Sequence, residues 1–179
     1  GVARNTPEGI EVRVHPMLIP ERHPLASVND SFNAVFVHGD AVDDAMFYGR
    51  GAGELPTASA VVGDIFDIAR NLQYECCGRI SCTCYKQLPI KAMDDICSKY
   101  FLRMLVENEP GVLAAVTAVF GDRKVSIEQI IQKKKIGELA EIVVITEKVK
   151  ERHVKDSLKA FEEMTAVKKV SSVIRVYGE

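Results

Sequence analysis

The sequence lacks the features that would direct the chain into a membrane, onto nucleic acid or out of the cell. None of its apolar runs approaches the roughly 18–20 residues needed to cross a bilayer. The formal net charge of −2 provides no basic field that would attract nucleic acid. The opening residues, Gly1 to Asn5, contain no basic segment followed by an apolar core, as a secretory signal would. We therefore expect a cytoplasmic protein that binds neither membranes nor nucleic acid.

An initiating methionine is also missing, which suggests a processed or truncated chain. The composition is that of a soluble globular protein, with 47% apolar and 27% charged residues. A length of 179 residues fits one ordinary domain or two small ones.

The five cysteines all lie between Cys76 and Cys97. Their odd number, without a secretion signal, favours reduced thiols over a disulfide framework. The first four follow the pattern C-C-x4-C-x-C, which matches neither usual zinc pattern, and no histidine is near them in sequence. We interpret residues 75–98 as a cysteine-containing linker without a metal site, with a structural metal as the less favoured alternative.

The first zone, residues 1–74, contains the elements of a larger domain. Apolar and charged residues alternate over residues 10–14, which predicts a half-buried strand, and two more short strands are expected at residues 33–38 and 45–48. A helix is predicted by the spacing of Val61, Ile65, Ile68 and Leu72. Three short strands and one helix leave apolar faces without a second layer, so this zone is expected to be incomplete.

The third zone, residues 99–179, has a regular order of elements. Strands are expected at residues 101–106, 126–132, 139–146 and 167–177. One helix is expected from Pro110 to a stop at Gly121, and a second carries Val154, Leu158 and Phe161 on one face. The order βαββαβ is the plan of a ferredoxin-like α+β fold. The lysine run at residues 133–135 is expected at a solvated hairpin tip.

The glycine-rich segment Gly49–Gly53 precedes the predicted helix of the first zone. Glycines allow the backbone to approach a ligand closely, and a helix N-terminus presents free N–H groups to a polar or anionic ligand. The spacing does not match the dinucleotide fingerprint G-x-G-x-x-G, so the spacing alone favours a tight structural turn over a ligand-binding loop. The histidines at positions 15, 23 and 38 are interpreted as polar packing residues rather than as metal ligands or acid–base groups.

The first zone resembles the last part of homoserine dehydrogenase catalytic domains. The resemblance runs from Val12 to Asp64 and is carried mainly by residues 14–20, 23–28, 33–36, 48–53 and 56–64. It implies that Gly51, Ala52 and Gly53 lie beside a nicotinamide cofactor, NADP or NAD. It also implies that the nucleotide-binding fold and the catalytic residues belong to segments that are not in this chain. We therefore assign no catalytic residue and expect the chain alone to be inactive and to bind no cofactor tightly.

The third zone resembles an ACT domain, an amino-acid-sensing module. The resemblance covers residues 100–177 and is strongest over Leu105–Ala114 and Ser126–Gln132. Where the family often has Asp, this chain has Asn108, which weakens the pairing with a ligand ammonium. A helix that begins near Pro110 can hold a carboxylate at its free N–H groups, while Asn108 can hydrogen-bond an amino acid. The expected effector-binding residues are Asn108, Pro110, Gly111, Val112, Leu113 and Gln129.

Together the resemblances predict residues 1–74 as a partial α/β catalytic-domain segment, 75–98 as the linker and 99–179 as the ACT domain. The implied parent enzyme interconverts L-homoserine and L-aspartate 4-semialdehyde in threonine and methionine biosynthesis. The ACT domain is expected to form a homodimer or higher oligomer and to bind an amino-acid effector, with L-threonine the first candidate. Dimerisation alone remains open for that domain. The alternative for the whole chain is a stand-alone amino-acid-binding and dimerisation module without catalysis.

Overall fold

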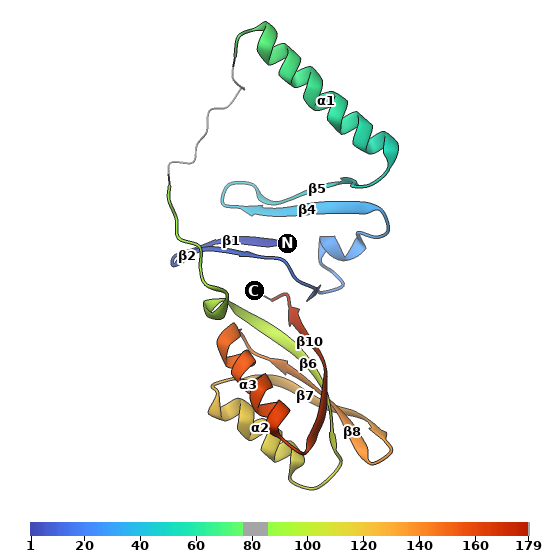
Figure 1. Cartoon of the computed structure of the whole chain (residues 1–179), viewed down its shortest axis with the longest axis vertical. Helices are drawn as coiled ribbons and strands as arrows, with labels where there is room; N and C mark the ends of the chain where they lie inside the picture. The colour runs from blue at the N-terminus through green and yellow to red at the C-terminus, as the bar shows by residue number, and fades with distance from the viewer. Residues whose placement is uncertain (77–85, 179) are drawn as a thin grey trace. The chain divides into compact units, whose positions relative to one another are not determined.

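The computed structural model describes residues 1–76 and 86–178, and they divide into two compact units (Figure 1). The larger unit combines Gly1–Ile19 with Leu88–Glu179, and the smaller unit is Pro20–Gln87. No helix among the described residues has the length and apolar character needed to span a membrane.

The larger unit is built on a sheet whose main strands lie in the order β3-β10-β6-β8-β7. After the short turn η2 (Met93–Asp95), its elements are β6 (Cys97–Glu107), α2 (Val112–Asp122), β7 (Ile127–Ile136), β8 (Leu139–Thr146), β9 (Val149–Lys150), α3 (Glu151–Glu163) and β10 (Val167–Val176). The long strands pair antiparallel, and Figure 1 shows α2 and α3 on one side of them. The predicted βαββαβ plan and ferredoxin-like fold are confirmed.

The core of this unit lies between the two helices and one face of the sheet. Leu102, Met104 and Val106 are buried on β6, as the alternation predicts, and they pair in register with buried residues of β8. Phe120 of α2 and Phe161 of α3 are fully buried and meet edge to face, with ring centroids 5.0 Å apart. The aromatic pair therefore joins the two helices over the centre of the sheet.

Two local expectations for this unit are corrected. Helix α2 begins at Val112 with Gly111 as its N-cap, so Pro110 lies before the cap and not at the first helical position. The lysine run 133–135 lies within β7, and the hairpin turn is Gly137–Glu138. Pairing with β8 continues through two register shifts, between Ile127 and Gln129 and between Gln132 and Lys134, and it carries β7 past the point where the apolar pattern ends.

The N-terminal residues join the larger unit through backbone hydrogen bonds. Strands β1 (Val2–Thr6) and β2 (Gly9–Arg13) form a hairpin, and β3 (Met17–Leu18) pairs parallel with the end of β10. The Ile10 N–H donates to the Pro89 carbonyl at 2.8 Å, and the Lys91 N–H donates to the Ile10 carbonyl at 2.9 Å.

The alternation predicted for β2 is present, but the buried face is the charged one. Glu11 and Arg13 are buried, whereas Val12 and Val14 are 52% and 87% exposed. Glu11 pairs with Lys91 at 3.5 Å, and the Arg13 guanidinium donates to the Ser98 hydroxyl at 2.8 Å. These partners come from distant parts of the chain, so the local pattern could not indicate which face would be covered.

A buried carboxylate lies where α3 begins. Glu151 accepts hydrogen bonds from the Tyr100 hydroxyl of β6 and from the Arg175 guanidinium of β10, the latter at 2.6 Å. The Arg175 guanidinium also lies over the Tyr100 ring, 5.7 Å from its centroid. Burial and the hydrogen bond to Glu151 raise the pKa of Tyr100, so its hydroxyl remains a donor. The three side chains tie α3 to the neighbouring strands β6 and β10.

The smaller unit contains a hairpin and a long helix. After the short turn η1 (Pro24–Ser27), β4 (Phe32–Gly39) pairs antiparallel with β5 (Asp43–Arg50), and α1 (Glu54–Gln73) follows. The rings of Phe32 and Tyr48 stack with centroids 4.9 Å apart. The two predicted strands and the predicted helix are confirmed, but the apolar residues that predicted the helix are more than half exposed.

The helix-to-helix contact in the core gives a first prediction. Replacement of Phe161 by alanine should lower the free energy of unfolding of the larger unit by about 3–5 kcal/mol, because it removes a fully buried ring from Phe120. Chemical denaturation followed by circular dichroism measures the change. Lys159→Ala, on the exposed face of the same helix, should change it by less than about 0.5 kcal/mol. Equal losses for the two variants would show that the core is placed elsewhere.

Glu151 gives a second prediction, for the pH dependence of stability. Burial opposes its ionisation, but hydrogen bonds from Arg175 and Tyr100 outweigh that effect and hold the pKa of Glu151 below 4.5. The folded pKa is lower than the unfolded one, so the stabilisation is complete above the unfolded pKa and is lost as pH falls through the folded pKa. Acid titration of unfolding should therefore show a loss of stability below about pH 4.5 that Glu151→Gln diminishes.

At neutral pH, Glu151→Gln should lower the free energy of unfolding by about 3 kcal/mol, because the half-buried Arg175 guanidinium then lacks its counterion. Glu163→Gln, at the exposed end of the same helix, serves as the control. If the Glu151→Gln variant still loses as much stability at low pH as the unchanged chain, the loss belongs to other carboxylates.

Candidate functional site

The loop between β6 and α2 lies beside the turn of the β7–β8 hairpin. The Asn108 backbone N–H donates to the Glu138 carbonyl at 3.1 Å, and the Gln132 side-chain amide donates to the Asn108 side-chain oxygen at 3.2 Å. Gln132 is therefore the strand residue that contacts the loop. Gln129 lies on the opposite face of β7, because the two glutamines are three positions apart with no register shift between them.

Helix α2 begins with backbone N–H groups that no side chain caps. Its N-cap, Gly111, has a φ of 90°, a left-handed conformation that favours glycine, and it makes no side-chain cap hydrogen bond. Val112 beside it is half-buried, and Leu113 is 41% exposed. The Val112 N–H donates to the Glu109 carbonyl at 3.3 Å, and no side chain caps the helix start. The loop thus combines a helix N-terminus without a side-chain cap, an amide side chain and an apolar side chain, a set that suits the carboxylate and side chain of an amino acid.

Strand β7 forms the free edge of the sheet next to this loop. Its regular stretch, Gln129–Gln132, lies between the two register shifts, and the lysine run follows. Bulges and lysines on an edge strand oppose pairing with another strand. Any edge-to-edge contact between copies is therefore confined to the half of β7 that lies before Lys133, next to Gln132 and Asn108.

The glycine-rich segment of the smaller unit connects β5 to α1. The Gly51 N–H donates to the Ser31 carbonyl at 3.2 Å, and Ala52 is exposed. Gly53 is the N-cap of α1, with a φ of 124° that an L side chain rarely adopts, and it makes no side-chain cap hydrogen bond. The first N–H groups of α1 therefore have no side-chain cap, as a site for a polar or anionic group requires.

His15, His23 and His38 make local polar contacts. His15 contacts the Pro16 carbonyl at 2.9 Å, and burial lowers the pKa of His15. His23 accepts a hydrogen bond from the Leu25 N–H, and His38 lies 2.8 Å from the Asp44 carboxylate. These contacts agree with polar packing.

The cysteines are only partly described. Cys76 and Cys97 are exposed free thiols, and Cys77, Cys82 and Cys84 lie outside the described residues. Among the residues that the structure does describe, no cluster of three or more His, Cys, Asp or Glu side chains is placed to hold a metal ion.

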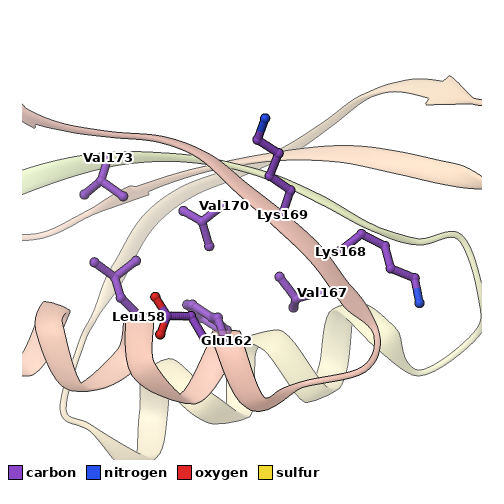
Figure 2. A pocket seen from close by; sticks show the side chains of 8 residues that line it. Leu158, Glu162, Val167, Lys168, Lys169, Val170 and Val173 are labelled. Carbon is purple, nitrogen blue, oxygen red and sulfur yellow. The ribbon is translucent and has the colours of Figure 1, made fainter.

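A groove that the sequence did not indicate lies between α3 and β10 (Figure 2). Its volume is about 460 Å³, and it is lined by Leu158, Phe161, Glu162, Val167, Lys168, Lys169, Val170 and Val173. In Figure 2 the valine side chains point toward α3, while Lys169 points away from it. Lys168 is engaged by Glu107 at 2.5 Å. The apolar periodicity of the sequence predicted α3 and β10, which form the two walls of the groove. No local signal in the sequence shows that part of the β10 edge lacks a neighbouring strand.

The chain matches two family models. Residues 1–66 match homoserine dehydrogenase, and residues 100–165 match the ACT domain. The first match contains the glycine-rich segment, and the second contains the loop at Asn108 and helix α2.

Curated relatives match almost the whole chain. Homoserine dehydrogenase from Neisseria gonorrhoeae is 43% identical over 98% of this chain, and that from Bacillus subtilis is 39% identical over 99%. In both cases the chain spans 42% of the relative's length.

Solved structures give the same picture. A homoserine dehydrogenase from Thiobacillus denitrificans superposes with a TM-score of 0.85 at 37% identity, over 98% of this chain and 41% of that one. The S. aureus homoserine dehydrogenase at pH 7.0 gives a TM-score of 0.57 at 25% identity, over 99% and 40%. The chain is therefore similar to the C-terminal part of homoserine dehydrogenases, and its match to that family's model is followed by the match to the ACT domain.

Proposed function

We propose that the protein to which this chain belongs catalyses the NAD(P)-dependent interconversion of L-homoserine and L-aspartate 4-semialdehyde in the cytoplasm. This reaction leads to threonine and methionine. The observation that carries the proposal is the presence of both family matches in one chain, 98% of which aligns with a homoserine dehydrogenase at 43% identity.

Within such an enzyme, this chain contributes residues that contact the cofactor, and the catalytic residues belong to other segments. Gly51, Ala52 and Gly53 are exposed just before α1, whose first N–H groups no side chain caps. We assign them to cofactor contact. The apolar face of α1 is exposed along its length, as expected of a helix that packs on a nucleotide-binding fold supplied by the rest of the enzyme. No G-x-G-x-x-G motif is present in these 179 residues.

This division predicts that the chain alone binds NADP weakly or not at all. Calorimetric titration of the 179-residue chain should give no affinity in the micromolar range, and homoserine should produce no NADPH. The full-length protein that contains the chain should show both properties. Micromolar NADP affinity of the chain alone would contradict the assignment of the phosphate-binding part to other segments. A full-length protein without homoserine-dependent NAD(P) reduction would contradict the proposed activity.

For the ACT domain we propose the sensing of an amino-acid end product, with L-threonine as the first candidate. The ligand carboxylate would lie at the start of α2, where Pro110, Gly111 and Val112 lead into uncapped N–H groups beside Leu113. Asn108 and Gln132 would supply the side-chain hydrogen bonds. Because these residues adjoin the free β7 edge, a second ACT domain paired there would enclose the ligand. Effector control then requires different affinities for two states of the enzyme.

A calorimetric screen of L-threonine, L-lysine and L-methionine tests this site. One of them should bind, and Asn108→Ala or Gln132→Ala should weaken that binding about tenfold, because each removes a hydrogen-bonding side chain at the loop. Gln129→Ala, on the other face of β7, decides whether the site extends around the strand. Absence of heat with all three amino acids would leave dimerisation as the role of the domain.

A stand-alone sensing and dimerisation module without catalysis is the second candidate. The larger unit favours it, because it has a complete hydrophobic core of its own. An amino-acid response without dehydrogenase activity in the full-length protein would support this candidate over the first.

A further inference from the structure

One face of the ACT sheet remains uncovered by the helices of the larger unit. Residues that alternate with the core positions of the strands occupy this face, because the core positions face α2 and α3. Figure 1 shows both helices on the other side of the strands. The apolar members of this open face are Phe101, Leu105, Ile131, Ile145 and Ile174, which are half-buried or exposed, and Val143, which is buried.

Two opposite charges lie in the middle of the open face. Arg103 is opposite Val143, and Glu141 is opposite Leu105, so the two charged residues are diagonal neighbours on adjacent strands. Arg103 is exposed and Glu141 is half-buried. Neither makes an ion pair with any residue in the described part of the chain. The face therefore carries two uncompensated charges of opposite sign among apolar side chains.

We propose that the open face binds the same face of a second copy of this chain. A two-fold axis that lies between the sheets and passes between Arg103 and Glu141 places each guanidinium over the partner's carboxylate. The contact then contains two equivalent ion pairs, and the surrounding apolar residues pack sheet against sheet. An isologous interface requires such a self-complementary patch, and the diagonal placement of the two charges provides it.

This surface is separate from the β7 edge and the Asn108 loop. It deepens the proposed self-association of the ACT domain by naming the residues that make the contact, and it needs no effector. Edge pairing through β7 and face pairing through Arg103 and Glu141 can occur in the same assembly, because they use different sides of one sheet. Pairing by both routes would join four chains.

Charge reversal with the full 179-residue chain tests the proposal by sedimentation equilibrium. Arg103→Glu and Glu141→Arg, each alone, should raise the dissociation constant of the face contact roughly tenfold or more, because like charges then face each other. The double variant should restore association, since its two pairs are again opposite in sign. Lys148→Glu, an exposed reversal after β8, is the matched control and should change nothing.

An equimolar mixture of the two single variants provides the decisive measurement. One variant carries two acidic groups on the face and the other carries two basic groups, so the mixed pair should associate as tightly as the unchanged chain. A misfolded variant would not be rescued in this way, and thermal unfolding by circular dichroism checks the fold independently.

An assembly size and a dissociation constant that neither single reversal changes would overturn the proposal, and so would a mixture without rescue, whereas edge pairing through β7 alone would leave a dimer. The face would then contact solvent or another part of the enzyme. Titration of Arg103→Glu with L-threonine keeps the two proposals apart, because loss of the face contact should leave effector binding at the Asn108 loop in place.

Discussion

The larger unit depends on one buried carboxylate, that of Glu151. A buried charge destabilises the fold unless it is paired and hydrogen-bonded, so Glu151 can be tolerated only where Tyr100 and Arg175 reach it. The pairing fixes the start of α3 against β6 and β10. With α3 in place, Phe161 meets Phe120, both helices cover the same face of the sheet, and the opposite face is left open.

Much of the ACT fold was predictable because its signals are local. The alternation of Leu102, Met104 and Val106 and the helical spacing of Val154 and Phe161 identify the buried faces without knowledge of their partners. The polarity of β2 was not predictable. Arg13 is buried because it reaches Ser98, 85 residues along the chain, and an alternating pattern alone does not show which face such a partner will cover. Likewise, only the pairing with β8 carries β7 through the lysine run.

The candidate effector site was predictable in part for the same reason. The motif around Asn108 and Gly111 is contiguous, so the sequence alone could locate the loop and the helix start. The sequence alone could not choose between Gln129 and Gln132. Residues three positions apart in a strand face opposite sides, so only one of them can face the loop. The hydrogen bond to Asn108 identifies that residue as Gln132. The groove beside β10 depends on which strand edge stays open, a property of the whole sheet.

The exposed apolar surfaces of the two units differ in a way that bears on what covers them. Helix α1 carries exposed apolar residues at helical spacing, including Val61, Ile65 and Ile68, and such a stripe suits permanent packing within one folded protein. The open face of the ACT sheet instead places Arg103 and Glu141 among its apolar residues. A permanent core would leave these charges buried without partners, at a high cost in free energy. A two-fold contact pairs both charges, which favours a second copy as the occupant of this face.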